Sequence, residues 1–402
     1  MARRYFGTDG VRGIVGEAIT PQLVEKLGKA VALWSGRGRV FVGRDTRASG
    51  VELEEALARG IASAGGNAVL AGVLPTPAVA LLALDVGAVI TASHNPPEYN
   101  GVKFFDSHGQ KLTDASEEEI EALLDSDAPG GGTVDHVEIA PDSYLQHVVD
   151  RFGSGLTGLR IGVDCANGAY TQIAPRAFTR LGASVTAIGV EPDGTNINED
   201  CGATDLRALQ RIVKDNALDL GVAFDGDRIL AVLAPHLNVD LVAVTVMSNL
   251  GLHSFLEDRS IRVITTDVGD RYVLEALREH GGLLGGEQSG HIIYLRDHVT
   301  GDGLAAALLL CDAIRGRTLA EAGAEMPTFP QVKENLPLRS SLPAALLEEV
   351  QRLNTALDGS ARVLVRPSGT EPVVRLLAEA RTEAEARELS ATIAALVRRE
   401  LG

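Results

Sequence analysis

Residues 88–96 read Ala-Val-Ile-Thr-Ala-Ser-His-Asn-Pro, so that an apolar run passes directly into a polar loop. Ala88-Val89-Ile90 predicts a buried strand, and Pro96 ends the loop because the residue before a proline is kept out of helical conformation. Ligands of open α/β sheets bind at the carboxyl ends of the strands. Ser93 therefore presents its hydroxyl at a candidate ligand site, with His94 beside it. Taken alone, a serine–histidine pair is more often a plain polar turn.

Short β-branched runs alternate with amphipathic stretches along the rest of the chain. Residues 21–32 predict a helix, with Thr20 as its N-cap and Pro21 as its first residue. Residues 40–42, 68–70, 160–163 and 218–223 predict strands. This alternation predicts an α/β fold, with three successive mixed-sheet α/β domains and a smaller C-terminal α+β domain. The 402 residues suffice for two to four domains of about 100–200 residues each.

Composition excludes several classes of function. Lys and Arg number 37 against 54 Asp and Glu, a net charge of −17, which disfavours binding to nucleic acid or anionic membranes. An anionic substrate would then need a local basic pocket. Three scattered cysteines without metal-ligand spacing indicate a reducing compartment: Cys165, Cys201 and Cys311. The sequence shows no signal peptide and no apolar run of about 18 residues, so we expect a cytoplasmic protein that does not enter the membrane.

A second polar segment, Asp225-Gly226-Asp227-Arg228, follows the apolar run at 218–223. Two carboxylates two residues apart can meet one hard cation from a single loop, and Mg²⁺ typically uses one or two carboxylates together with phosphate and water. Arg228 could hold a phosphate oxygen beside that ion. An acidic surface turn explains this segment equally well.

Two further loops carry candidate ligand groups. In Gly285–His291, Glu287, Gln288 and Ser289 could bind sugar hydroxyls or an amine, although a glycine-rich turn is the commoner meaning of such a pattern. Near the C-terminus a proline-bounded loop offers backbone N–H groups, two hydroxyls and two flanking guanidinium groups to a phosphate that does not react. Its candidate residues are Arg366, Ser368, Gly369, Thr370 and Arg375. A plain turn would leave the two arginines unexplained.

These segments, in this order, resemble the α-D-phosphohexomutase superfamily over nearly the whole chain. The resemblance also rests on four other segments: Tyr5–Gly13, Gly43–Arg47, Asp164–Gly168 and Val268–Tyr272. The opening segment and Gly286–His291 look most like the phosphoglucosamine mutases, bacterial isomerases that interconvert glucosamine 6-phosphate and glucosamine 1-phosphate.

The resemblance implies four domains around a central cleft, each contributing one loop. The expected spans are 1–150 with the phosphoserine loop, 155–240 with the metal loop, 241–325 with the sugar-recognition loop, and 330–402 with the phosphate-binding loop. Ser93 would carry the phosphate, and Arg12, His94 and Lys103 would line the reaction centre. One Mg²⁺ would bind phosphorylated Ser93, Asp225 and Asp227. The substrate-binding residues would be Arg228, Glu287, Ser289, Arg366, Ser368, Gly369, Thr370 and Arg375.

The resemblance further implies a small phosphosugar substrate, a sugar 1,6-bisphosphate as activator, and leaves a homodimer open. Two departures from the family pattern stand out. The metal loop of the family has one Gly-Asp step more than Asp225–Arg228. The family also has a helix of roughly 20 residues before the segment that matches Met247–Gly251, and this sequence leaves no room for it. The third domain should therefore be shortened. The open alternatives are a phosphoglucomutase or phosphomannomutase, a phosphatase, or a metal-impaired phosphosugar-binding protein.

Overall fold

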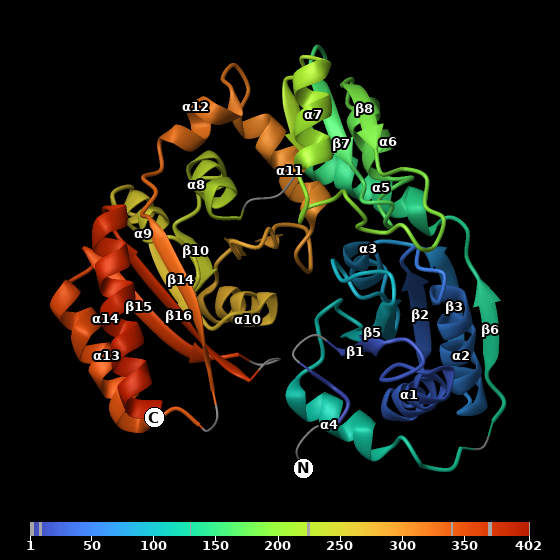
Figure 1. Ribbon diagram of the computed structural model, residues 1–402. Helices are drawn as coiled ribbons and strands as arrows, with labels where there is room; N and C mark the ends of the chain where they lie inside the picture. The colour runs from blue at the N-terminus through green and yellow to red at the C-terminus, as the bar shows by residue number, and fades with distance from the viewer. Residues whose placement is uncertain are drawn as a thin grey trace.

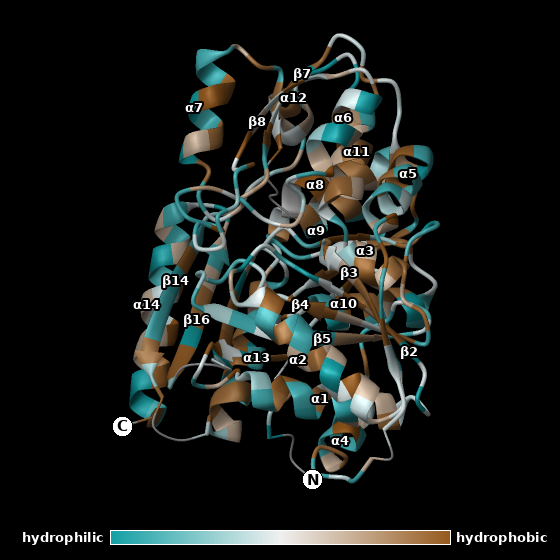
Figure 2. Ribbon diagram, turned by 90° about the vertical axis from the view of Figure 1, so that its right-hand side faces the viewer, coloured by the Kyte–Doolittle hydropathy of each residue, from teal (hydrophilic) through white to brown (hydrophobic). Residues whose placement is uncertain are grey.

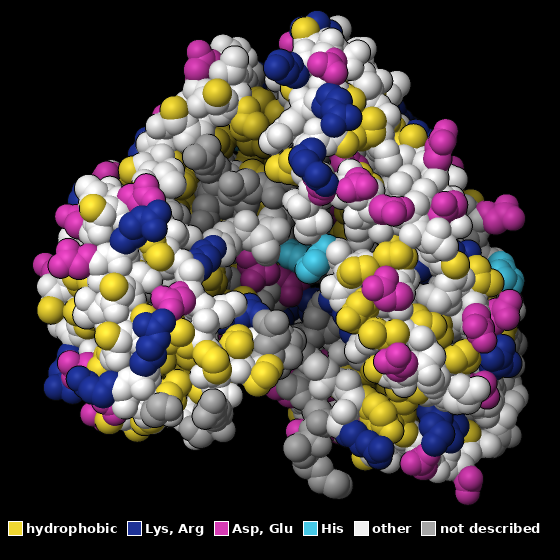
Figure 3. Space-filling model, viewed as in Figure 1, with side chains coloured by type: hydrophobic (Ala, Val, Ile, Leu, Met, Phe, Trp, Pro, Cys, Tyr) yellow, Lys and Arg dark blue, Asp and Glu magenta, His cyan; other side chains and the backbone are white. Residues whose placement is uncertain are grey.

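The computed structural model describes residues 4–7, 10–128, 130–222, 226–338, 341–368 and 372–401. Within these residues four sheets are formed, each covered by helices, and Figure 1 shows the four units arranged around a central opening. The space-filling view shows a hollow between the first two units and the last two, with basic, acidic and histidine side chains inside it (Figure 3). The expected α/β fold with a central cleft is therefore confirmed.

The first domain is built on a six-stranded mixed sheet of order β1-β5-β4-β2-β3-β6. β5 pairs antiparallel with β1 and β4, and the remaining pairs are parallel. Its elements are β1 (Val11–Ile14), α1 (Pro21–Trp34), β2 (Arg39–Arg44), α2 (Gly50–Ser63), β3 (Asn67–Val73), α3 (Thr76–Leu81), β4 (Val86–Ile90), β5 (Tyr99–Asp106), α4 (Asp114–Ala122) and β6 (Thr133–His136). The predicted start of α1 is confirmed, because the Thr20 hydroxyl accepts a hydrogen bond from the Leu23 N–H and Pro21 opens the helix.

The second domain has three described strands in the order β8-β7-β9, all parallel. Its elements are α5 (Ala140–Phe152), β7 (Arg160–Asp164), α6 (Ala174–Arg180), β8 (Ser184–Ile188), α7 (Arg207–Asp215) and β9 (Leu220–Val222). A mixed sheet was expected here. The described strands are parallel to one another because α6 and α7 each return the chain to the end of the sheet at which the preceding strand began.

The third and fourth domains differ in sheet type. The third has the order β11-β10-β12-β13, in which only β13 is antiparallel, and the fourth has the antiparallel order β14-β16-β15 with its helices on one face. Figure 2 shows α11 as largely hydrophobic, in keeping with its buried position. The third-domain elements are α8 (Gly226–His236), β10 (Leu241–Thr245), α9 (Leu250–Glu257), β11 (Arg262–Thr266), α10 (Asp270–His280), β12 (Leu284–Gly286), β13 (Ile292–Tyr294), α11 (Gly303–Ala313) and α12 (Leu319–Ala324). The fourth-domain elements are β14 (Gln331–Pro337), α13 (Ala344–Leu357), β15 (Ala361–Pro367), β16 (Val373–Ala380) and α14 (Glu383–Leu401).

Helix α8 corrects the expected boundary at 240 and the expected loss of a third-domain helix. It packs against α9, α11, α12 and β12, all of the third domain. Every residue from Ile229 to Ala234 is buried, and a helix that is apolar on all sides belongs in the interior between other elements. The second domain therefore ends near β9, and the third domain keeps a helix before β10. Within the described residues, no helix is both long and apolar enough to cross a membrane.

Candidate active site

The Ser93 loop follows β4 directly. Ser93 is half-buried and has a φ of +55°, in the left-handed region that residues other than glycine rarely adopt. Its N–H donates to the Thr91 hydroxyl (3.0 Å). Strained backbone of this kind is concentrated at functional sites. The predicted loop is thus a defined structure that sets the direction of the serine side chain.

Arg47, whose side chain is fully buried, stabilises the backbone of this loop. Its guanidinium donates to four carbonyl oxygens of the loop, those of Ser93 (3.0 Å), Asn95 (2.8 Å), Pro96 and Tyr99 (3.0 Å). Asp45 pairs with the Arg47 Nε (3.0 Å) and accepts from Thr91 (2.7 Å). Sequence reasoning recorded Arg47 only as part of a family segment. A fully buried arginine needs several acceptors, but the sequence does not show which ones.

The structure places the three other expected reaction-centre residues around the same strand end. Arg12 on β1 lies opposite Gly101 on β5, and Lys103 is two residues further along β5, so both cations occupy one face of the sheet. Ile90 at the end of β4 pairs with Val102, next to Lys103. His94 is exposed and directly follows Ser93. Arg12 and Lys103 therefore bring two positive charges to the part of the sheet next to the end of β4, after which Ser93 follows.

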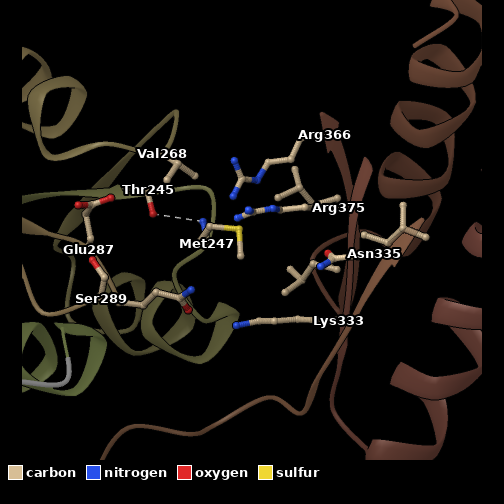
Figure 4. Close-up of a pocket in the computed structure, with 13 residues that line it drawn as sticks. Thr245, Met247, Val268, Glu287, Ser289, Lys333, Asn335, Arg366 and Arg375 are labelled. Atoms are coloured by element: carbon tan, nitrogen blue, oxygen red, sulfur yellow. Dashed lines mark hydrogen bonds between the residues drawn. The ribbon is translucent and has the colours of Figure 1, made fainter. Parts of the chain in front are cut away.

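A cavity of about 470 Å³ lies between the third and fourth domains. The third domain contributes Thr245, Met247, Val268, Glu287, Gln288 and Ser289, and the fourth contributes Lys333, Asn335, Leu364, Arg366, Arg375, Leu376 and Leu377. Figure 4 shows the basic side chains of Lys333, Arg366 and Arg375 reaching from the fourth-domain strands toward the third domain. The sugar-recognition and phosphate-binding loops expected from the sequence therefore share one cavity.

The third-domain wall is a tight turn between β12 and β13. Glu287 is 8% exposed; its carboxylate accepts from the Gly269 N–H (3.1 Å) and lies 3.7 Å from His291 Nδ1. A Cβ on Gly286 would lie 2.5 Å from the His291 carbonyl oxygen, so only glycine fits there. Ser289 stands beside Glu287 in the cavity (Figure 4). This wall presents a fixed negative charge and a hydroxyl.

The fourth-domain wall is positive. Arg366 on β15 pairs directly with Arg375 on β16, and burial together with the Arg375 charge lowers the pKa of Arg366. Like charges opposite each other in a sheet are destabilising, so this pair favours an anion between the two side chains. Ser368 follows β15 and its N–H donates to the Val373 carbonyl (2.8 Å), which closes the described part of the loop. Gly369 and Thr370 lie outside the described residues.

Lys333 is a further cation of this wall that sequence reasoning missed. Asn335 on β14 pairs with Arg375, and Lys333 lies two residues earlier on the same sheet face. In the described part of the chain no hydrogen bond or ion pair involves the Lys333 ammonium. The alternation of Lys333 and Asn335 along a strand was a usable signal, but only once the pairing of β14 with β16 was known.

Buried polar contacts fix the two cavity walls relative to each other. The Asn249 side chain donates to the Phe329 carbonyl (2.9 Å) and accepts from the Phe329 N–H (2.9 Å). Glu379, fully buried, accepts from the Leu250 N–H (2.8 Å) and from Arg362 (2.8 Å). Burial raises the pKa of Glu379, while Arg362 opposes that shift. The family segment at 247–251 is thus the junction between the third and fourth domains.

The expected metal loop lies largely outside the described residues. Asp225 and the side chains of Asp227 and Arg228 lie outside the described residues, but the backbone is helical from Gly226 onward. Asp227 and Arg228 therefore lie in the first turn of α8, whose positive dipole end disfavours a cation. Among the described residues, no group of three His, Cys, Asp or Glu side chains could hold a metal ion. The side chains predicted to hold Mg²⁺ are thus not among the described ones, so the metal loop stays a prediction, and we assign no reaction step to an ion held there.

Models of known families match nearly the whole chain. They describe the phosphoglucomutase/phosphomannomutase α/β/α domains I, II and III at residues 3–129, 142–232 and 225–329, and the C-terminal domain at 324–396. Phosphoglucosamine mutase of Pelotomaculum thermopropionicum is 44% identical over 429 residues, with 96% of each chain covered. The chain belongs to the phosphoglucosamine mutase family. Members of this family are isomerases of the phosphohexomutase type, and the chain is therefore an isomerase of that type.

Other relatives agree with this membership. The phosphoglucosamine mutase of Desulforudis audaxviator is 46% identical, with 94% of each chain covered. A phosphoglucomutase/phosphomannomutase family protein of Burkholderia thailandensis has the same fold, with a TM-score of 0.84 at 24% identity over 100% of this chain and 97% of that chain. Aspergillus fumigatus N-acetylphosphoglucosamine mutase, solved in complex with GlcNAc-6P and magnesium, matches with a TM-score of 0.68 at 16% identity over 100% and 96% of the two chains.

The chain is shorter than the relatives with which it aligns. The alignment with the Clostridium acetobutylicum phosphoglucosamine mutase runs over 444 positions, and 444 − 402 leaves at least 42 at which this chain has no residue. Residues 225–232 match both the end of the domain II model and the start of the domain III model. The structure assigns residues 226–232 to the third domain as part of α8.

Proposed function

We propose that this enzyme interconverts glucosamine 6-phosphate and glucosamine 1-phosphate through a phosphorylated Ser93 and a sugar bisphosphate. One observation carries the proposal beyond family membership: the opposite charge of the two cavity walls. Arg366 and Arg375 face one side, and the Glu287 carboxylate faces the other. A substrate with a phosphate and an ammonium group matches this polarity, whereas glucose and mannose phosphates lack the ammonium.

In the proposed reaction the non-reacting phosphate binds between Arg366 and Arg375, and Glu287 and Ser289 bind the sugar. The free sugar hydroxyl then faces phosphorylated Ser93. A sugar O–P bond forms as the Ser93 O–P bond breaks, and the hydroxyl proton passes to His94 or to water. Arg12 and Lys103 neutralise charge on the transferring group, which is the main requirement of phosphoryl transfer. The bisphosphate then reorients and returns its other phosphate to Ser93.

We propose the same auxiliary groups that the family resemblance implies. These are phosphorylation of Ser93, a sugar 1,6-bisphosphate as activator, and Mg²⁺, which was present in the solved A. fumigatus relative. Mg²⁺ when bound would neutralise phosphate charge, but the described residues offer no ligand set for it. We also propose that the protein acts in the cytoplasm on this small phosphosugar.

Phosphorus NMR tests the proposal directly. Purified protein is incubated with Mg²⁺, a trace of the 1,6-bisphosphate and the 6-phosphate of glucosamine, glucose or mannose in turn. Conversion of the glucosamine compound to its 1-phosphate, fastest of the three and absent in Ser93→Ala, supports the proposal. Release of inorganic phosphate would instead indicate a phosphatase.

The helical start of α8 favours a second candidate, a protein that binds the phosphosugar without transferring phosphate. Calorimetric binding of glucosamine 6-phosphate with no conversion in the NMR assay would support that candidate. Conversion at a rate that EDTA abolishes would exclude it and would show that the reaction needs a metal ion.

A further inference from the structure

A side chain of the second domain, that of Asn198, reaches the Ser93 loop. Asn198 lies after β8, and its amide donates to the carbonyl oxygens of Ser93 (3.0 Å) and Asn95 (3.2 Å). Both acceptors belong to the first domain, 105 and 103 residues earlier in the chain. This contact directly links the second domain to the residue proposed to carry the phosphate.

Arg47 and Asn198 share these two acceptors. The Arg47 Nη2 donates to the Ser93 oxygen at 3.0 Å and to the Asn95 oxygen at 2.8 Å. A carbonyl oxygen has two lone pairs, so one donor from each domain fills its capacity. Arg47 fixes the loop within the first domain, and Asn198 makes the loop position depend on where the second domain lies.

Asn198 is itself held in place before it meets the loop. Its φ is +61°, a left-handed conformation in which asparagine is enriched, and its N–H donates to the Ala166 carbonyl (3.0 Å). The same segment is fastened to the first domain by the hydrogen bond from the Ala48 N–H to the Gly194 carbonyl (2.8 Å). The Asn198 amide therefore loses little conformational entropy when it binds the Ser93 loop.

We propose that Asn198 is a positioning residue for phosphate transfer, which keeps Ser93 in its left-handed conformation and couples it to the second domain. This proposal rests on the proposed function. A left-handed conformation is unfavourable for serine, and donors on its own carbonyl help to offset that cost. Movement of the second domain away from the first would remove one of these donors. The position of the second domain and the alignment of the Ser93 hydroxyl are then coupled.

The test variant is Asn198→Gly, which tolerates the positive φ while removing both donors. The control is Asn196→Ala, because the Asn196 side chain bonds only within its own segment, to Glu191 and Asp193. Two properties are measured in each: kcat and KM for glucosamine 6-phosphate, and hydrogen exchange in the peptide 91–100. We expect kcat to fall at least about tenfold in Asn198→Gly with KM within twofold of wild type, since small misplacement of a reacting group is costly. Exchange in the peptide should rise only in that variant.

Wild-type kcat and exchange in Asn198→Gly would overturn the proposal. An equal loss of activity in both variants, or a drop in Tm with KM rising alongside, would show general loosening and overturn it as well. The exchange measurement does not require turnover. If wild-type protein fails to convert the sugar, the proposed function fails, while faster exchange confined to peptide 91–100 in Asn198→Gly still supports the role of Asn198 in holding the loop.

Discussion

Replacing Arg366 with methionine should weaken substrate binding and stabilise the free protein. Arg366 and Arg375 lie directly opposite each other on β15 and β16, half-buried, and the Arg375 charge helps to lower the pKa of Arg366. Two cations held in this way repel each other until an anion binds. Opposite effects on binding and on stability therefore follow from one arrangement.

The structure sets both magnitudes. A hydrogen bond between charged groups contributes about 1.5–3 kcal/mol, so loss of Arg366 should lower the affinity for glucosamine 6-phosphate by about 10- to 150-fold. Removal of a like-charge pair across strands should raise the free energy of unfolding by about 0.2–1 kcal/mol. Methionine keeps much of the apolar contact of the arginine stem, so packing should change little.

Calorimetric titration measures the affinity, and urea unfolding measures the stability. Arg362→Met is the matched control on the same strand, because Arg362 pairs with the fully buried Glu379 and lies outside the cavity lining. It should lower stability by roughly 3–5 kcal/mol, since it leaves a buried carboxylate uncompensated. Unchanged affinity in Arg366→Met, or a loss of stability as large as that of the control, would refute this view of the phosphate site.

Three further outcomes are expected. Lys333→Met should raise KM for the sugar phosphate about tenfold with kcat unchanged. Lys214→Met, which replaces an exposed lysine on α7, should change neither constant. The same KM in both variants would show that Lys333 is not part of the site. Asp227→Asn should leave Mg²⁺ affinity in calorimetry within twofold of wild type, because Asp227 lies in the first turn of α8; a large loss would restore the metal loop. Burial lowers the pKa of His253 from 6.5 to about 4. The free energy of unfolding should therefore fall by up to about 3 kcal/mol as the pH drops from 6.5 toward 4, because the unfolded chain takes up the proton first. His253→Gln should flatten this pH dependence in urea unfolding.

Local patterns in the sequence were sufficient to predict several helices and strands of the fold. Thr20 followed by Pro21 marks the start of α1 through chemistry confined to a few residues, and the structure confirms it. The apolar run before Ser93 marks β4 for the same reason. The loops at Ser93, Glu287 and Arg366 were also found, because each follows or begins a strand at the cleft.

The identity of α8 could not be derived from local pattern. Asp225–Arg228 has the composition of a metal loop. Its secondary structure, however, depends on the apolar residues that follow it, which are buried against α9, α11 and α12. That packing is tertiary and overrides the local motif.

Contacts between residues far apart in the sequence could not be predicted either. Arg47 and Asn198 both bind the Ser93 loop, yet they are separated from Ser93 by 46 and 105 positions. Lys333 joins the phosphate wall only through strand pairing with β16. Side chains of this kind carry no motif of their own, so a single sequence shows that they are polar but not what they hold.

The central claim is that phosphate passes between the sugar and Ser93. Intact-mass spectrometry after incubation with glucosamine 1,6-bisphosphate, followed by a rapid mix with glucosamine 6-phosphate, tests it most directly. We expect one phosphate on the wild-type chain, none on Ser93→Ala, and loss of that phosphate to the sugar at the rate of turnover. Conversion of the sugar by a chain that never carries phosphate, or undiminished conversion by Ser93→Ala, would contradict it.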